Sequence, residues 1–199
     1  MLTCEHASNR LPAAFKKAVP ESVLNTHRAY DIGAAQVFRK LVKFAKPEFY
    51  CEGKYSRLFV DLNRTITNKS AFSDYLRNNE KAKAQATTYW NEYRAAIEKF
   101  VKANAKKEII HLGIHSFTPE LNGKVRNTDI GILYDPSRPK ECELAQVIKA
   151  EIKRLHPEMK VRFNYPYKGT SDGLTTTLRK KIGPRYAGLE IEINQKFFK

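Results

Sequence analysis

Side chains that bind metal ions and move protons follow short apolar segments of this chain. Glu5 and His6 come directly after the first such segment, and His115 follows the apolar run at 109–114. Imidazole nitrogens and carboxylate oxygens are the ligands that zinc takes in proteins. The sequence contains no His-Glu-x-x-His motif. A zinc site would therefore collect its ligands from separated segments, which is normal for a catalytic zinc.

Two of the five histidines, His111 and His115, lie four residues apart within one predicted strand. Successive side chains of a strand point to opposite faces, so these two histidines share a face. A single histidine is more often structural than a metal ligand. Two of them near the end of a strand, with a carboxylate nearby, favour a metal site, and the one at the strand end is the candidate ligand.

Two glutamates near the end of the chain also share one side of a predicted strand. Glu190 and Glu192 alternate with Leu189, Ile191 and Ile193, so both carboxylates face the side opposite to the apolar residues. Held in a cleft, one of these carboxylates would serve as a general base. A half-exposed strand at the edge of a sheet would give the same pattern.

Two arginines, Arg57 and Arg64, flank the apolar segment that carries Asp61. Arginine is the side chain best suited to bind a carboxylate through two parallel hydrogen bonds. These arginines are therefore candidates to bind a substrate carboxylate. The alternative is an arginine–aspartate pair that is internal to the protein.

Apolar spacing predicts the elements that would position these groups. Repeats of three and four residues predict helices over 31–46, 80–107 and 140–155, and Pro47 stops the first of them. Short apolar runs predict strands over 1–4, 58–62, 108–114, 129–134, 160–164 and 189–193. Strands alternating with helices are typical of α/β folds. We expect residues 1–199 to form a single three-layer domain, with a mixed central sheet and helices on both faces.

The amino-acid composition and the charge argue against several classes of protein. The 199 residues include 36 Lys and Arg against 21 Asp and Glu, a net charge of +15. The lysines are scattered at positions typical of the polar sides of helices, which favours a solvated surface over one that binds nucleic acid. No apolar stretch is long enough to span a membrane. Three widely spaced cysteines without a CxxC motif favour a reducing, cytoplasmic location.

Seven short blocks along nearly the whole chain resemble the N-formylglutamate amidohydrolase family, in the same order. They are CEHASNRLP at 4–12, His27 with DIGA at 31–34, SRLFVDLNR at 56–64, HSFTP at 115–119, DIGIL at 129–133, NYPY at 164–167 and EIEINQ at 190–195. The resemblance implies a fold like that of the zinc carboxypeptidases and zinc desuccinylases, with one zinc ion at the strand ends.

The resemblance also implies a ligand set for that zinc. His6 and His115 match the metal-binding histidines of the family. Carboxypeptidases have a glutamate three residues after the first histidine, whereas this chain has Asn9 there. We expect Asp31 to supply the missing ligand, with Glu5 or Asn9 as alternatives. Asp31 is also a good N-cap residue for the helix that follows it.

The remaining roles follow from the same resemblance. Asn63 and Arg64 look like the pair that binds a substrate carboxylate in the carboxypeptidase relatives. Glu192 looks like the general base, with Glu190 as the alternative. Three further residues are candidates for substrate binding: Ser116, and Arg57 or Arg126 for a second carboxylate.

These expectations combine into a zinc-dependent amidohydrolase whose substrate is a small anionic N-acyl amino acid such as N-formylglutamate. Two alternatives stay open from the sequence. One is a metallo-carboxypeptidase or an amidase that acts on a peptide-like substrate. The other is a basic domain with a decayed active site that binds anions or nucleic acid.

Overall fold

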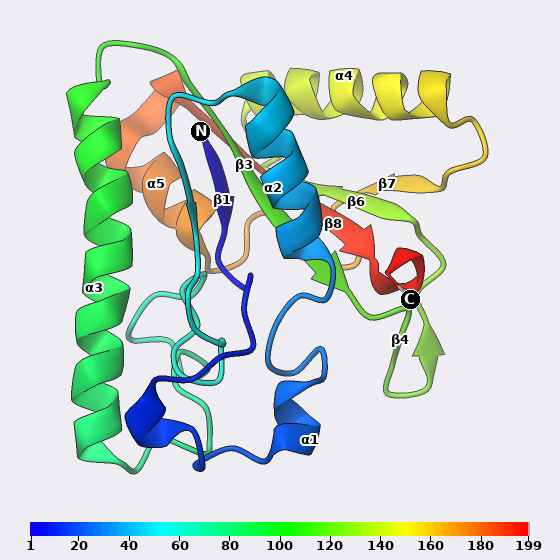
Figure 1. Cartoon of the computed structure of the whole chain (residues 1–199). Coiled ribbons are helices and arrows are strands. Elements are labelled where there is room, and N and C mark those ends of the chain that lie inside the picture. Colours follow the sequence, from blue (N-terminus) through cyan, green and yellow to red (C-terminus); the bar gives the residue numbers. More distant parts are fainter. Residues whose placement is uncertain (199) are drawn as a thin grey trace.

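The computed structural model describes residues 1–198, and its centre is a six-stranded mixed sheet (Figure 1). The strand order is β2-β1-β3-β8-β6-β7. The strands are β1 (Leu2–Cys4), β2 (Tyr50–Glu52), β3 (Ile109–Phe117), β6 (Ile130–Leu133), β7 (Val161–Phe163) and β8 (Tyr186–Asn194). β2, β1, β3 and β8 run parallel, whereas β6 is antiparallel to β8 and parallel to β7. β4 (Glu120–Leu121) and β5 (Lys124–Val125) form a separate hairpin.

Helices cover both faces of the sheet (Figure 1). α2 (Ala34–Ala45) and α4 (Pro139–Leu155) pack on one face, and α3 (Glu80–Ala103) and α5 (Leu174–Ile182) pack on the other. α1 (Glu21–Leu24) is a single turn outside these layers. Three short 3₁₀ turns complete the elements, at Ala13–Phe15, Gly183–Arg185 and Gln195–Phe197.

Side-chain alternation along the central strands assigns each residue to one of these two layers. Ile114 of β3 packs with Phe38 of α2. Tyr186 of β8 packs on the opposite face, in the cluster that contains Ile97 of α3 and Leu178 of α5. By the same alternation, the two histidines of β3 and the two glutamates of β8 lie on the α3 and α5 face.

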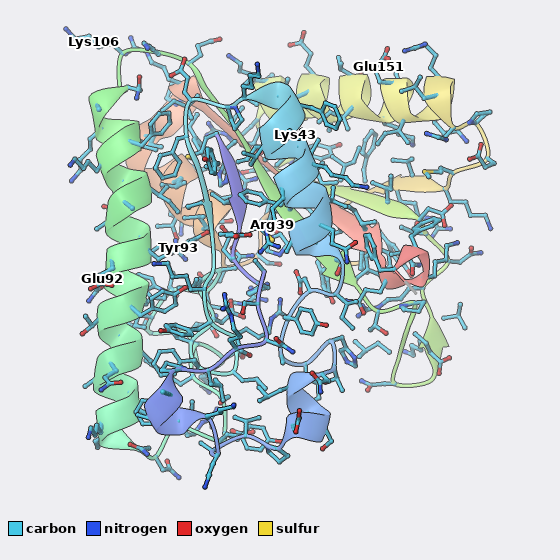
Figure 2. The ribbon with its side chains drawn as sticks, viewed as in Figure 1. Arg39, Lys43, Glu92, Tyr93, Lys106 and Glu151 are labelled. Atoms are coloured by element: carbon cyan, nitrogen blue, oxygen red, sulfur yellow. The ribbon has the colours of Figure 1, made fainter. Side chains whose placement is uncertain are left out.

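The charged side chains of the helices lie largely on their outer surfaces. Figure 2 labels Glu92 of α3 and Glu151 of α4, and also Lys106 in the turn after α3, and all three are exposed. No helix within residues 1–198 combines the length and the apolar character needed to cross a membrane.

The structure confirms the predicted fold class, with a six-stranded mixed sheet between two helical layers. Within the central sheet and its two helical layers, it adds two elements that the apolar pattern did not predict, β2 and α5. β2 has only three residues, and α5 contains three consecutive threonines and several basic residues, so neither element presents a long apolar stripe.

The prediction of a strand over 58–62 is wrong. This segment forms consecutive turns. The amide of Phe59 donates to the carbonyl of Ser56, and that of Asp61 donates to the carbonyl of Ala71, so the backbone pairs within loops. Its apolar character has another cause, because Phe59, Val60 and Leu62 are buried in the core beneath α3.

Candidate active site

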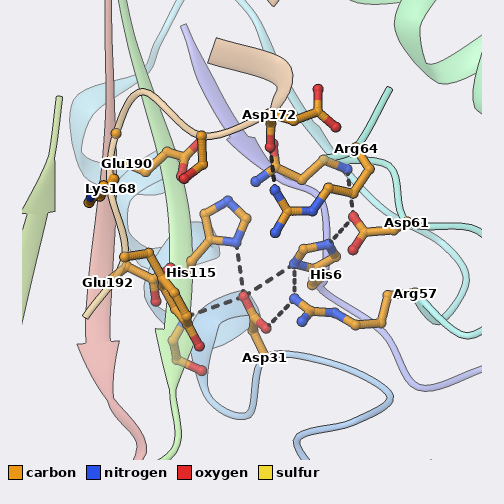
Figure 3. A pocket seen from close by; sticks show the side chains of 15 residues that line it. His6, Asp31, Arg57, Asp61, Arg64, His115, Lys168, Asp172, Glu190 and Glu192 are labelled. Carbon is orange, nitrogen blue, oxygen red and sulfur yellow. Dashed lines mark hydrogen bonds and ion pairs between the residues drawn. The ribbon is translucent and has the colours of Figure 1, made fainter. Parts of the chain in front are cut away.

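His6, Asp31 and His115 meet at the carboxyl end of the sheet (Figure 3). All three are buried, and their ligand atoms lie within 4.8 Å of one another. Oδ2 of Asp31 is 2.9 Å from Nδ1 of His115 and 3.4 Å from Nδ1 of His6. The triad forms part of the wall of a cavity of about 160 Å³.

The topology explains why these three segments meet. β1 and β3 are neighbouring parallel strands, so His6, which follows β1, and His115, near the end of β3, emerge at the same edge of the sheet. Asp31 lies in the loop that leads into α2. Its amide donates to the carbonyl of His6 at 3.0 Å, which fixes the loop against the end of β1.

Each histidine presents its second nitrogen to another carboxylate. Nε2 of His6 is 2.7 Å from Oδ1 of Asp61 and hydrogen-bonds to it. Nε2 of His115 is 3.1 Å from Oε2 of Glu5, at ion-pair distance but without the alignment of a hydrogen bond. Carboxylates commonly hold metal-binding histidines in this way, on the nitrogen that does not bind the metal.

The chemistry of this group of donors fits a zinc ion. Two imidazoles and one carboxylate are a typical set for a catalytic zinc. Nη2 of Arg57 contacts Nδ1 of His6 and donates to Oδ1 of Asp31 at 2.7 Å. The Asp61 carboxylate can only accept, so Nε2 of His6 donates to it and bears the proton of the neutral ring. Nδ1 therefore has the lone pair that a metal ligand needs.

Electrostatics in the triad favour positive charge at the two rings. Burial lowers the pKa of His115, but contacts with Asp31 and Glu5 outweigh it and raise that pKa well above its usual range. Burial and Arg57 lower the pKa of His6, and Asp61 and Asp31 outweigh them and raise it. Burial raises the pKa of Asp31, whereas Arg57 and His6 hold it well below its usual range. A metal cation would meet the same favourable field.

The alternatives to Asp31 as a ligand receive no support from the geometry. Glu5 faces the far side of His115, and the amide of Asn9 donates to Asn25. The interpretation of Asp31 as a side-chain helix cap is wrong. The cap position of α2 is Gly33, with a positive φ of 82°, and the Asp31 carboxylate binds His115 and Arg57.

Glu192 lies directly beside the triad. It pairs with His115 in the register between β8 and β3, and its Oε2 is buried without a hydrogen-bond partner among residues 1–198. Burial raises the pKa of Glu192 to about 8, opposed by His115 and assisted by Asp31 and Glu190. A carboxyl with such a pKa, facing a cavity, is suited to exchange protons near neutral pH.

Glu190 shares this side of the strand but has a different environment. Its Oε1 accepts a hydrogen bond of 3.0 Å from Oγ1 of Thr175, in the first turn of α5. The interpretation of the two glutamates as an edge-strand pattern is wrong, because β8 is paired on both sides, with β3 and with β6. Both carboxylates line the cavity.

The pair Asn63 and Arg64 also lines the cavity. Oδ1 of Asn63 accepts from the amide of Leu174 at 2.8 Å, which leaves its amide nitrogen as the donor group. Nη1 of Arg64 contacts the carbonyl of Asp172. Two side chains of α3, Trp90 and Arg94, each donate to the carbonyl of Arg64 at 3.0 Å. The long helix therefore fixes the backbone of this turn.

The other predicted substrate-binding residues differ in their placement. Ser116 lines the cavity, but its hydroxyl donates to the carbonyl of Ile32 and accepts from Gln195, and its amide faces Asp31. Arg126 is not among the residues that line the cavity, and its guanidinium donates to the hydroxyl of Tyr167 at 3.1 Å.

The sequence interpretation assigned no site role to the loop between β7 and α5, although the NYPY block begins it. This loop forms another part of the cavity wall. Its lining residues are Tyr167, Lys168, Gly169, Ser171 and Asp172. The Asp172 carboxylate accepts from the amide and hydroxyl of Thr65 and from the amide of Asn68, which ties the two loops together. The signal was present as a polar, glycine-containing stretch directly after a predicted strand.

A sequence profile of the N-formylglutamate amidohydrolase family matches residues 1–198. The chain belongs to this family. The match spans every segment that contributes to the cavity, and membership of an N-formylglutamate amidohydrolase family implies a hydrolase that acts on an amide.

One solved structure supports the same assignment at the level of the fold. The chain is similar to the crystal structure of gene product Atu2144 from Agrobacterium tumefaciens, with 29% sequence identity and a TM-score of 0.78. The alignment covers 100% of this chain and 81% of that chain. A search of curated proteins found no match. The family assignment therefore rests on the profile, and the similar structure supports its fold.

Proposed function

We propose that this protein is a zinc-dependent amidohydrolase that cleaves the amide of an N-acyl acidic amino acid, with N-formylglutamate as its substrate. The observation that carries the proposal is the buried triad of His6, Asp31 and His115 beside the carboxylate of Glu192, on the wall of one cavity. Family membership supports the amide as the bond that is cleaved.

In this proposal, His6, Asp31 and His115 hold the zinc ion. When bound there, zinc lowers the pKa of a water molecule and polarises the amide carbonyl. Glu192 accepts a proton from the attacking water at its buried Oε2 and returns it to the leaving nitrogen. Hydrolysis of N-formylglutamate then yields formate and glutamate.

Arg64 and Asn63 would bind the α-carboxylate of the substrate, since both line the same cavity as the triad. Figure 3 shows the guanidinium of Arg64 near His6 and Asp172. The contact of Arg64 with the Asp172 carbonyl orients its guanidinium and leaves further N–H groups for a ligand. Arg57 is already engaged with Asp31, and Arg126 with Tyr167. Arg64 is therefore the better candidate for this contact. We further propose a cytoplasmic location, which the three free cysteines support.

A substrate panel tests this proposal. Zinc-loaded protein is assayed for acid release from N-formyl, N-acetyl and N-succinyl derivatives of glutamate, aspartate and glutamine. We expect N-formylglutamate to give the highest kcat/KM. Amidation of its α-carboxylate should reduce kcat/KM strongly in the wild type and far less in Arg64→Ala, because this variant has already lost the contact. Equal losses in both proteins would show that Arg64 does not bind the carboxylate.

The two rival functions predict other results in the same experiment. A metallo-carboxypeptidase would cleave N-acyl dipeptides faster than N-formyl amino acids. A basic binding domain with a decayed site would retain no zinc and would cleave none of these compounds.

A further inference from the structure

Glu5 adjoins the metal-binding triad, yet its carboxylate faces away from Asp31. Its Oε2 lies 3.1 Å from Nε2 of His115, whereas Nδ1 of the same ring is 2.9 Å from Oδ2 of Asp31. The imidazole of His115 therefore stands between two carboxylates, one on each nitrogen. Glu5 is itself 1% exposed, so this contact is shielded from water.

The backbone holds Glu5 in this position. β1 pairs with β3 so that Thr3 lies opposite Gly113, and the same parallel register continued by two residues brings Glu5 beside His115. The amide of Gly53 donates to the carbonyl of Cys4 at 2.9 Å. A side chain at Gly53 would collide with the carbonyl oxygen of Glu5, so this glycine permits the close approach of the two segments.

The long helix α3 holds the other oxygen of this carboxylate. Tyr93 is a buried residue of α3, and its hydroxyl donates to Oε1 of Glu5 at 3.1 Å. Figure 2 labels Tyr93 on the side of α3 that faces the sheet. With Oε1 bound by Tyr93, Oε2 is the oxygen that is directed at His115.

A neutral histidine can bind a metal through only one ring nitrogen, because the other one has the proton. Nε2 of His115 is buried and has no hydrogen-bond partner among residues 1–198, and the Glu5 carboxylate is the group that faces it. We propose that Glu5, held by Tyr93, is a positioning residue that keeps the proton of His115 on Nε2 and turns Nδ1 toward the metal. This inference rests on the metal site of the proposed function.

In this proposal, a carboxylate holds the second ring nitrogen of each histidine of the triad, and the two carboxylates come from different parts of the chain. Asp61, in a turn near His6, supports that ring directly at 2.7 Å. Glu5 needs Tyr93, so the affinity for the metal becomes coupled to the packing of α3 against the sheet. Carboxylates of this kind typically change metal affinity 10–100-fold when they are replaced.

The experiment measures zinc affinity by competition with a chromophoric chelator, in the wild type and in Glu5→Gln and Tyr93→Phe. Tyr186→Phe is the matched control, because its buried hydroxyl bonds His111, the structural histidine of the same strand, at 2.6 Å. We expect Glu5→Gln to retain one zinc per chain with an affinity about 10–100-fold lower. Tyr93→Phe should show a smaller loss, and Tyr186→Phe should match the wild type.

A second measurement identifies directly which ring nitrogen of His115 is ligated and which is protonated. In the ¹⁵N spectrum of the zinc-loaded wild type, we expect Nδ1 of His115 to be ligated and Nε2 to be protonated. A ligated Nε2 would overturn the proposal. Complete loss of zinc in Glu5→Gln would overturn it too, because Glu5 would then be a ligand itself.

Unchanged zinc affinity in both Glu5→Gln and Tyr93→Phe would also overturn the proposal, while leaving the proposed function intact. If Glu5→Gln does not fold, the zinc affinity of Tyr93→Phe and the ¹⁵N spectrum of the wild type test the proposal. A wild type that binds no zinc would contradict the proposed function, and this inference with it.

Discussion

The amino-terminal part of β3 and its carboxyl end each contain a buried histidine on the same face of the strand, in different surroundings. His111, near the start of the strand, contacts two hydroxyl groups, those of Thr3 at 2.8 Å and Tyr186 at 2.6 Å. His115 near the end lies between the carboxylates of Asp31 and Glu5. Burial lowers the pKa of His111 to about 3, whereas the carboxylates raise that of His115 well above its usual range.

The difference between these two regions shows what makes a buried histidine chemically useful. Burial alone disfavours the charged ring, and a hydroxyl group does not compensate for the lost water as a carboxylate does. The carboxylates collect at the end of the sheet because neighbouring parallel strands and their loops end there. The part of β3 around His111 lies beneath α3 and α5, and the ring of His111 bonds the hydroxyl groups of Thr3 and Tyr186.

The largest contrast between the two regions is expected in metal content. His115→Ala and Asp31→Asn should both abolish the retention of one zinc per chain, since each removes a ligand or its charge. His111→Gln should retain the zinc. Metal analysis after dialysis against a weak chelator checks this.

Equal zinc content in all three variants would contradict the expected difference between His115 and His111. Loss of zinc from His111→Gln alone would place the metal near His111, at the start of β3, instead.

A smaller contrast is expected along β8, where Glu190 lies nearer the middle and Glu192 nearer the end. Glu192→Gln should lower kcat by a factor on the order of 10² or more, because a general base is lost, and should leave KM nearly unchanged. Glu190→Gln should lower kcat less, since this carboxylate bonds Thr175 at the start of α5. Steady-state kinetics of both zinc-loaded variants measure these losses of kcat. A larger loss in Glu190→Gln than in Glu192→Gln would make Glu190 the base.

The residues of the candidate site differ in how far the sequence alone predicts their placement. Alternation along a strand placed His111 with His115, and Glu190 with Glu192, because it follows from the backbone alone. His6 stood out by its position after the first apolar segment, whereas only the family resemblance singled out Asp31. These residues lie in different loops, and only the tertiary fold brings them within reach of each other.

The remaining features depended on long-range contacts that a single sequence does not reveal. Tyr93 belongs to an aromatic stripe that indicates core packing, and only the placement of α3 directs its hydroxyl at Glu5. Asp172 has no apolar pattern around it, and its role in joining two loops follows from the fold. The predicted strand at 58–62 failed because its apolar residues are buried in turns.

The smallest effect expected is a pH-dependent change in stability that arises from His111. Its pKa is about 3 in the folded protein, against about 6.5 in an unfolded chain. Between these values the unfolded state binds one more proton, so the free energy of unfolding falls as the pH falls through this window. His111→Gln should be less stable than the wild type at pH 7, because the replacement packs less well.

The stability gap between these two proteins should then narrow by about 1 kcal/mol per pH unit as the pH falls from 6 to 4, since glutamine does not titrate. Urea unfolding at several pH values gives the gap, and His115 titrates in both proteins, so its contribution cancels in the difference. A gap that stays constant would mean that His111 is protonated as readily in the folded protein as in the unfolded chain. The hydroxyl-lined site of His111 would then accept charge as the carboxylate-lined end of β3 does, and the contrast between the two regions would not hold.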